Sequence, residues 1–518
     1  MMKSIQRLYF LFFGMLVLAS CESQEKMPYS NDGTQKWFEA SQKPFYHGVA
    51  SGDPLKDAVI IWTRVTPEFQ HQIEVDYLVA EDESFEKIVA KGHVHTDSTK
   101  DYTVKLDVKG LQPGTHYFYK FQALGAVSPV GRTKTLAAEK VKEVKLAVVS
   151  CSNFEFGYFN AFGRIADRKN LDAVIHLGDY IYEYAPGGYG DTSIGRIVLP
   201  PNEIVSLQDY RTRYATYRLD KDFQLAHQQH PFICIWDDHE ITNDSHVSGA
   251  ENHQPEEEGD YNERKKIARK VYFEWMPVRE NEGQEIYRTM AYGDLVDLIM
   301  LDGRLAGRTP PVDSLTDPNY GSETQSMLGK EQLAWFKEQL KNSTATWKVV
   351  GNQVIFSELD ISVLPGRTFN FDAWDGYPVE RNGLIEFFEQ DSIENVVILT
   401  GDSHCSWAFE VPRSGTDYRT TNEAVAIEFG TTSISSSNYD EYTSIDTVKY
   451  AEIVYQQLNP HLKYVNLSDH GYMLLTLTGD KAQADWYYVE TLKTRDAKEF
   501  AGGSMLVRNG TTKLEASN

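Results

Sequence analysis

The chain has 518 residues, of which 41% are hydrophobic and 24% charged, so it is too long for one small domain and apolar enough to bury a sizeable core. Asp and Glu (75) outnumber Lys and Arg (51), and the formal net charge of -24 argues against non-specific binding to nucleic acid, which requires basic patches. Four cysteines in a chain of this length exclude a disulfide scaffold.

Residues 1–20 have the pattern of a secretory signal peptide. Lys3 and Arg7 precede an apolar stretch over 8–18, which is too short to span a bilayer as a permanent helix. The following Leu-Ala-Ser-Cys resembles the lipobox of bacterial lipoproteins, in which the cysteine, here Cys21, becomes the lipidated N-terminus. This predicts a lipid-anchored protein of the bacterial cell envelope, facing the periplasm or the cell surface. An ordinary signal peptide with a chance cysteine is the alternative.

Two further segments precede the region that carries the chemistry. Residues 21–43 are polar and predict a flexible tether between anchor and fold. From 44 to 136, apolar and polar residues alternate with period two in short stretches separated by turns, which predicts an all-β sandwich of immunoglobulin or fibronectin type III kind. No chemistry clusters there, so packing or recognition is its expected role.

Residues 144–495 have a different pattern, in which apolar strands alternate with helices such as those over 264–275 and 330–341. This alternation predicts an α/β domain. Residues 496–518 are expected to form a C-terminal tail. The strands expected in the α/β domain are KLAVVSC, LDAVIHLGD, PFICIWDD, LVDLIMLD, WKVVGNQVIF and NVVILTGD.

Polar side chains follow these strands where each one ends. They are Cys151, Asp179, Asp238 with His239, Asn352 with Gln353, and Asp402 with His404. In open α/β sheets the carboxyl ends of the strands form one rim, at which ligands bind. Carboxylates gathered there repel one another unless cations neutralise them. Oxygen ligands with few histidines favour a cluster of two or more metal ions.

The order GD-x-x-Y, DDHE and GD-x-H resembles the calcineurin-like metallophosphoesterases. Four departures are specific: Tyr182 replaces an Asp, as in purple acid phosphatases, Asp238 stands where Asn usually bridges, Asp402 replaces a His, and Cys151 replaces the first Asp. Together they resemble the PhoD-like alkaline phosphatase/phosphodiesterase family. Four longer segments carry the same resemblance: FYHGVASGDPLKDAVIIWTRV, SCSNFEFGYFNAF, FDAWDGYP and NPHLKYVNLSDHGY.

The resemblance covers residues from about 44 to 495 and implies a four-layer αββα phosphoesterase sandwich behind an immunoglobulin-like domain. It also implies a site with two kinds of metal. Ferric iron would be held by Cys151, Asp179, Tyr182 and His404. Calcium, or another divalent ion, would be held by Asp179 as the bridge, Asp238 and Asp402, with Asn243 or Asp244 serving a further calcium. Whether Asn352 and Gln353 contact the site is left open.

Two further residues are expected to act on the substrate. His239, beside Asp238, is placed to help the leaving oxygen. Arg304, in LDGR after another strand, would clamp a phosphate oxygen; a surface ion pair is the competing interpretation. The implied function is hydrolysis of organic phosphate mono- or diesters by a metal-activated hydroxide, with release of phosphate.

Two other functions compete with this one. The first is phospholipase-D-like cleavage of phospholipid headgroups, with the anchor holding the enzyme near its substrate. The second is a non-catalytic surface lipoprotein with a decayed metal site. The second is disfavoured because Asp179, Asp238, His239, Asp402 and His404 are all present.

Overall fold

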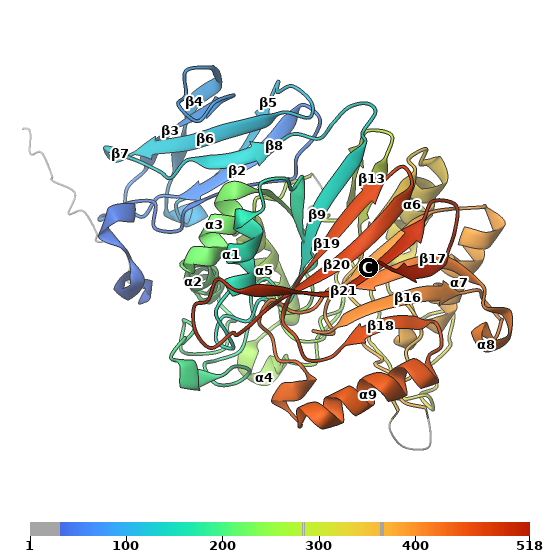
Figure 1. Cartoon of the computed structure of the whole chain (residues 1–518). Coiled ribbons are helices and arrows are strands. Elements are labelled where there is room, and N and C mark those ends of the chain that lie inside the picture. The colour runs from blue at the N-terminus through green and yellow to red at the C-terminus, as the bar shows by residue number, and fades with distance from the viewer. Residues whose placement is uncertain (1–31, 282, 284, 363–366, 518) are drawn as a thin grey trace, which may run out of the picture.

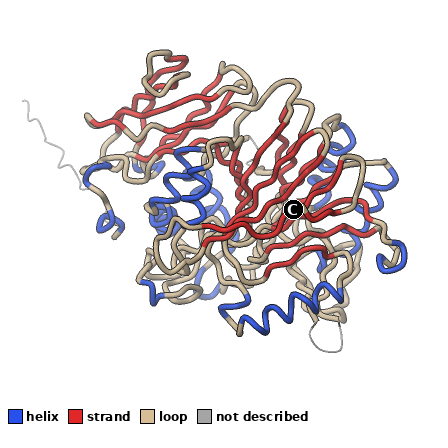
Figure 2. The backbone as a smooth tube through the Cα atoms, viewed as in Figure 1, coloured by secondary structure: helices blue, strands red, loops and turns tan. Residues whose placement is uncertain are grey.

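The computed structural model describes residues 32–281, 283, 285–362 and 367–517. The expected signal peptide and the lipobox with Cys21 lie outside the described residues. Two sheets packed face to face form the centre of the molecule, and helices cover their outer faces (Figure 1). Figure 2 shows long loops gathered at one end of these sheets.

The larger sheet has ten strands, and its middle three, β9, β10 and β11, run parallel. These three are apolar and almost wholly buried, as expected for strands covered on both faces. In sheet order the strands are β22 (Leu514–Ala516), β21 (Glu499–Arg508), β20 (Lys481–Val489), β19 (Gly471–Thr478), β9 (Glu143–Val149), β10 (Ala173–His176), β11 (Pro231–Cys234), β1 (Val49–Gly52), β2 (Ala58–Arg64) and β5 (Thr103–Lys109).

The second sheet has seven strands, of which β13, β14, β15 and β17 are parallel. In sheet order they are β12 (Arg288–Tyr292), β13 (Val296–Met300), β14 (Trp347–Gly351), β15 (Val396–Thr400), β17 (Ala424–Gly430), β16 (Ser406–Pro412) and β18 (Leu462–Asn466).

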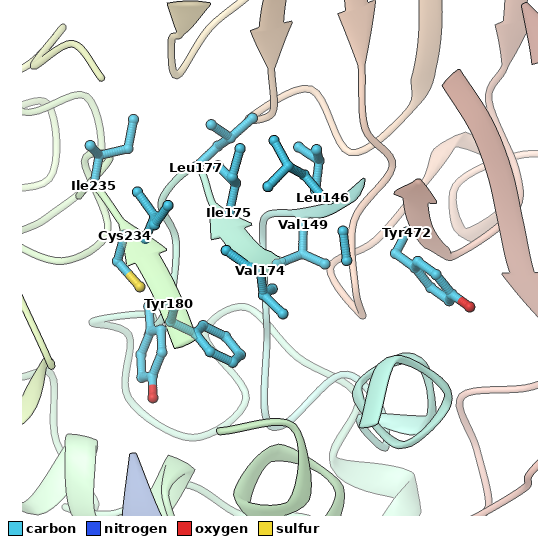
Figure 3. Packing of buried hydrophobic residues seen from close by; sticks show 14 of the residues in the cluster. Leu146, Val149, Val174, Ile175, Leu177, Tyr180, Cys234, Ile235 and Tyr472 are labelled. Atoms are coloured by element: carbon cyan, nitrogen blue, oxygen red, sulfur yellow. The ribbon is translucent and has the colours of Figure 1, made fainter. Parts of the chain in front are cut away.

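The largest hydrophobic core lies on both faces of the larger sheet. Between the two sheets it contains Leu146 of β9, Met300 of β13 and Leu399 of β15, and on the outer face it continues under the helices, with Phe162 and Phe223 among its residues. Figure 3 shows its packing around β9 and β10. Outside the larger sheet lie α1 (Asn160–Asp167), α2 (Leu207–Tyr217), α3 (Lys221–Gln229) and α5 (Tyr261–Trp275). Outside the smaller sheet lie α6 (Gly329–Asn342), α7 (Pro378–Gln390) and α9 (Ile445–Leu458). The predicted α/β class with αββα layers is confirmed.

The N-terminal β region is a sandwich that shares a sheet with the α/β region. Its separate sheet contains β4 (Ile88–Thr96), β3 (Ile73–Ala80), β6 (His116–Ala123) and β7 (Ala126–Val127), with β8 (Gly131–Lys134) paired to β6. Its other layer is β1, β2 and β5, and β1 pairs in parallel with β11. The predicted sandwich is therefore present, but backbone hydrogen bonds fuse it to the ten-stranded sheet.

Two expected segments differ in the structure. The described part of the tether, residues 32–43, forms the 3-10 turns η1 (Thr34–Trp37) and η2 (Ala40–Gln42), and Thr34 is fully buried. The Trp37 ring lies 6.5 Å from that of Phe154, so this part is packed rather than flexible. The expected tail over 496–518 contains β21 and β22, which extend the large sheet: β21 pairs with β20, and its consecutive residues Met505, Leu506 and Val507 are buried. In the described residues, no helix is both long and apolar enough to cross a membrane.

Candidate metal centre

The strand ends that form the site have strained backbones. Cys151 follows β9 and Asp179 follows β10, while Asp402 and His404 follow β15; their φ angles are 59°, 55°, 57° and 62°. This left-handed region costs a residue with a Cβ roughly 1–2 kcal/mol. Non-glycine residues persist there when the surrounding structure imposes the conformation, and such strain gathers at functional sites. The backbone thus turns these four side chains at a stability cost.

A first group of metal-ligating atoms comes from three strand ends. Ligand atoms of Cys151, Asp179 and His404 all lie within 4.8 Å of one another. The Tyr182 hydroxyl lies 3.1 Å from Asp179 Oδ2 and 3.4 Å from His404 Nε2. Since His404 Nδ1 donates to the Ser437 carbonyl at 2.8 Å, the lone pair of Nε2 faces the group. The structure therefore brings together the four residues assigned to one metal from the sequence.

A second group adjoins the first through a shared residue. Asp179, Asp238 and His239 form one close set of ligand atoms, and Asp237, Asp238 and Asp402 form another. Asp179 thus lies between the two groups, which is the position of a bridging carboxylate. Its Oδ1 is buried and has no hydrogen-bond partner.

The electrostatics of this arrangement call for cations. Burial raises the pKa of Asp179 well above its usual range, and the carboxylates of Asp237 and Asp238 raise it further. Burial, with the Asp237 and Asp372 carboxylates, does the same to the pKa of Asp402. Bound cations would reverse these shifts by favouring the charged forms. A thiol, a phenol, an imidazole nitrogen with its lone pair free, and an orphaned carboxylate oxygen fit such ions, and the site is a metal-binding site.

Comparison with known proteins places the chain in a family. The model described as PhoD-like phosphatase matches residues 146–486, and the model of the N-terminal domain of PhoD-like phosphatases matches residues 32–137. The chain belongs to the PhoD-like phosphatase family. It is 36% identical over 469 residues to alkaline phosphatase D of Bacillus subtilis (strain 168), covering 86% of this chain and 78% of that protein. A solved structure of PhoD matches with a TM-score of 0.83 and 33% identity, covering 93% of each chain.

The family resemblance read from the sequence motifs is confirmed by these matches. Like its relative, this member of the family is a phosphoric ester hydrolase. The metal-binding strand ends therefore form the place where a phosphoric ester is expected to react.

Arg304 is not at the surface, so the competing surface ion pair is wrong. Its side chain is fully buried, with Nε bonded to Asp237, Nη1 2.8 Å from Asp372 Oδ1 and Nη2 3.2 Å from Asp402 Oδ1. It therefore binds the acidic cluster, and its charge offsets part of the carboxylate repulsion. A guanidinium held on three sides in this way reaches a phosphate only by giving up a carboxylate partner.

His239 faces the metal centre from a fixed orientation. Its Nδ1 lies 2.6 Å from Glu183 Oε2, and its ring lies 4.3 Å from that of Tyr182. Burial alone would lower the pKa of His239, but the carboxylates of Glu183 and Asp238 raise it well above its usual range. The Glu183 contact leaves Nε2 as the nitrogen free to act toward a substrate.

The side chain of Asn243 is turned away from the clusters, because its amide nitrogen lies 3.2 Å from Glu251 Oε2. Asp244 instead joins the acids: its backbone N–H donates to Asp238 Oδ2 at 2.6 Å. Burial, together with the Asp372 and Asp238 carboxylates, raises the pKa of Asp244 to about 7. Of the two candidates for a further ion, the structure favours Asp244.

The two amides after β14 hold the strand ends together. Gln353 Nε2 donates to the carbonyls of Trp236 and Leu301 at 2.9 Å, and its Oε1 accepts from the Gly303 N–H at 3.1 Å. The Asn352 side chain bonds the Val354 carbonyl and the Trp374 indole. The hydrogen bonds of both side chains go to backbone groups and an indole that hold the strand ends. Asn352 and Gln353 therefore support the site, and this is the role that the sequence left open.

Sequence reasoning missed four residues of the site: Asp372, Glu183, Ser436 and Tyr189. Asp372 lies within FDAWDGYP and pairs with both Arg304 and Arg308. The Ser436 hydroxyl lies 2.6 Å from the Tyr182 hydroxyl, and the Tyr189 hydroxyl lies 3.4 Å from His404 Nδ1. Two of them had a signal: Asp372 lies in a family-like segment, and Glu183 directly follows Tyr182 of the GD-x-x-Y motif. Ser436 and Tyr189 come from loops without a pattern.

Proposed function

We propose that this chain is a secreted, lipid-anchored phosphoesterase that uses ferric iron and calcium to hydrolyse organic phosphate mono- or diesters. The observation that carries the proposal is the shared Asp179 between two groups of ligand atoms. Thiol and phenol ligands, when ionised, suit a trivalent ion at Cys151 and Tyr182, and carboxylates suit calcium at Asp238 and Asp402.

The metal ligands, His239 with Glu183, and Arg304 have different roles in the reaction. Two cations held by these residues would lower the pKa of a bound water and place positive charge at the phosphoryl oxygens. Glu183 orients His239, whose Nε2 is positioned to give a hydrogen bond or proton to the departing oxygen. Arg304 keeps three carboxylates of the cluster in place.

Removal of metal tests the proposal. Prolonged treatment with EGTA is expected to abolish hydrolysis, and added calcium is expected to restore it, because the Asp238 and Asp402 carboxylates suit calcium. Activity and metal content are measured in parallel on the same preparation, with magnesium addition as the control. Full activity in protein shown to be free of metal would refute the metal-dependent mechanism.

Anchoring depends on Cys21, the cysteine that ends the lipobox-like segment. Cys21→Ser is expected to yield either uncleaved precursor or released soluble protein, because serine has no thiol to carry the lipid. Fractionation and mass spectrometry of the N-terminus measure this. A processed and still membrane-bound Cys21→Ser protein would show that anchoring lies elsewhere, while leaving the phosphoesterase assignment untouched.

A phospholipid substrate is the second candidate, and one surface favours it. Tyr442, Ile445, Tyr450 and Ile453, on and just before α9, are 72%, 51%, 66% and 55% exposed. The Tyr442 hydroxyl lies 2.6 Å from Ser437 Oγ, and the Ser437 carbonyl accepts from His404, so hydrogen bonds connect this surface to the metal centre. Tyrosines with exposed aliphatic side chains suit a bilayer interface. We propose that a zwitterionic phospholipid surface docks here, since Glu452 is neutralised by Lys449 at 2.8 Å and Asp446 leaves the helix with no excess positive charge to attract anionic lipid.

The double change Tyr450→Asp and Ile453→Asp tests this surface. Hydrolysis of phosphatidylcholine in vesicles is expected to fall about 10-fold or more, because burying one such side chain contributes about 1.5–3 kcal/mol and 1.4 kcal/mol is tenfold. Hydrolysis of a soluble nitrophenyl diester is expected to stay unchanged. Leu225→Asp on α3, at a residue that is also exposed, is the matched control. Unchanged phosphatidylcholine hydrolysis in the double variant would refute this docking surface. Absence of phosphatidylcholine hydrolysis by the unmodified protein would eliminate the phospholipid candidate.

A further inference from the structure

A loop over residues 431–437, here called the serine loop, contacts the first ligand group. The Ser436 hydroxyl lies 2.6 Å from the Tyr182 hydroxyl. The Ser437 carbonyl accepts a hydrogen bond from His404 Nδ1 at 2.8 Å. The serine loop supplies no atom to the three groups of ligand atoms. Its contacts therefore position residues of the metal centre rather than add a ligand.

The serine loop is also tied to the backbone of the strand ends. The Ser436 N–H and hydroxyl bond the Cys151 carbonyl at 3.3 Å and 3.0 Å. The Ser433 N–H donates to the His404 carbonyl at 3.1 Å. Cys151, Tyr182 and His404 come from three different segments, and all of them bond this one loop. Where the loop lies thus decides how these three residues meet.

His470 contacts the serine loop from the start of β19. Since β19 runs antiparallel to β9, its first residues lie beside the end of β9 (Figure 1). His470 is 8% exposed; its Nδ1 lies 2.9 Å from Ser433 Oγ and its Nε2 lies 3.1 Å from Glu441 Oε1. The next residue, Gly471, donates its N–H to the Ser433 carbonyl at 3.0 Å. His470 therefore joins Ser433 to an acid outside the loop.

The Ser433 hydroxyl has one proton, and its surroundings decide where that proton goes. The Ser436 carbonyl, at 2.7 Å, can only accept, and Asn438 Oδ1, at 3.4 Å, also accepts from the Glu441 N–H. Ser433 therefore donates to the Ser436 carbonyl, and His470 Nδ1 donates to Ser433. Since the Glu441 carboxylate accepts from Nε2, this is the arrangement of a protonated imidazole in an ion pair.

We propose that His470 is a positioning residue for the metal centre, acting through Ser433 on the serine loop that holds Tyr182 and His404. The inference rests on the metal centre proposed above. Hydrogen-bonding partners of metal ligands orient those ligands and raise the affinity for the ion. His470 lies behind these partners and fixes the Ser433 hydroxyl, whose proton in turn holds the Ser436 carbonyl.

Two substitutions of His470 test the inference, because each replaces a different ring nitrogen. The glutamine amide reaches the place of Nε2, and the asparagine amide the place of Nδ1. His470→Gln loses the contact to Ser433 and is expected to lower the affinity for the metal about 10-fold, since partners of ligands contribute about 10–100-fold. His470→Asn keeps the contact and is expected to retain most of the affinity. Titration of metal-loaded protein with EDTA at neutral pH, followed by elemental analysis, measures this.

The matched control is His461→Gln. His461 is 6% exposed and bonds the Glu358 carbonyl at 2.8 Å, at the end of β18 that lies away from His404. This variant is expected to lower the melting temperature and to keep its metal affinity. Equal losses of affinity in both glutamine variants would reduce the effect to general destabilisation and overturn the inference.

Failure of the inference and failure of the metal centre give different results. Unchanged metal affinity in His470→Gln, in a protein that loses its metal on Asp179→Asn, would overturn the role of His470 alone. Absence of bound metal in the unmodified protein would overturn the proposed function and, with it, the inference.

A double-mutant cycle tests the route through Ser433. Ser433→Ala is expected to lower the metal affinity by a similar factor, and His470→Gln is expected to add little to it, because residues that act through one contact are not additive. Additive losses would show that His470 acts by another route and overturn the inference. If His470→Gln does not fold, Ser433→Ala decides by itself, and full metal affinity in that variant is the contradicting result.

Discussion

Asp179→Asn is expected to lower kcat/KM more than 100-fold, because even the outer-shell partners of metal ligands contribute about 10–100-fold. The change removes a charge from the residue shared by both ligand groups and keeps the side-chain shape. Folding should survive, since asparagine tolerates the left-handed backbone, here with φ of 55°, better than most residues. Steady-state kinetics and elemental analysis of the purified variant measure the effect.

The matched control is Asp172→Asn. Asp172 is bound to Lys134 at the opposite end of β10, so its loss should leave activity and metal content unchanged. An Asp179→Asn protein with full activity and full metal content would show that Asp179 is not a ligand.

His239→Gln is expected to separate two leaving groups. A general acid contributes ~10²–10⁴-fold, and its contribution grows as the leaving oxygen becomes more basic. The variant should therefore lose much of its rate on an alkyl phosphate ester, lose far less on a nitrophenyl ester, and keep its metals. Rates on both esters and the metal content are measured on one preparation.

The close grouping of His239 with Asp179 and Asp238 makes a ligand role the alternative. Equal losses on both esters, with falling metal content, would support that role and refute the acid. Glu183→Gln provides a second readout. It keeps a hydrogen-bonding partner for His239 Nδ1 but removes the charge, so it should reproduce the leaving-group dependence in weaker form.

The sequence predicted those features whose pattern is confined to one segment of the chain, and missed those that depend on partners elsewhere. Apolar strands followed at once by acids or by Cys151 predicted the layers of the α/β region, because parallel strands buried on both faces are apolar throughout. The order of the motifs then predicted the family. The polar composition of residues 32–43 hid Trp37 and Phe38, whose packing partners Phe154 and Tyr46 lie outside that segment.

The sequence by itself determined the family, the α/β class and the strand ends that carry Cys151, Asp179, Asp402 and His404, because each of these is a local pattern. The tertiary structure alone decided what each side chain meets. Arg304 was expected to clamp a phosphate but binds three acids from separate loops. Of the two candidates for a further ion, Asp244 and not Asn243 adjoins the acidic cluster. Such partners lie up to 98 residues away from Arg304 in the chain, and no spacing in the sequence encodes contacts that only the packing of two sheets creates.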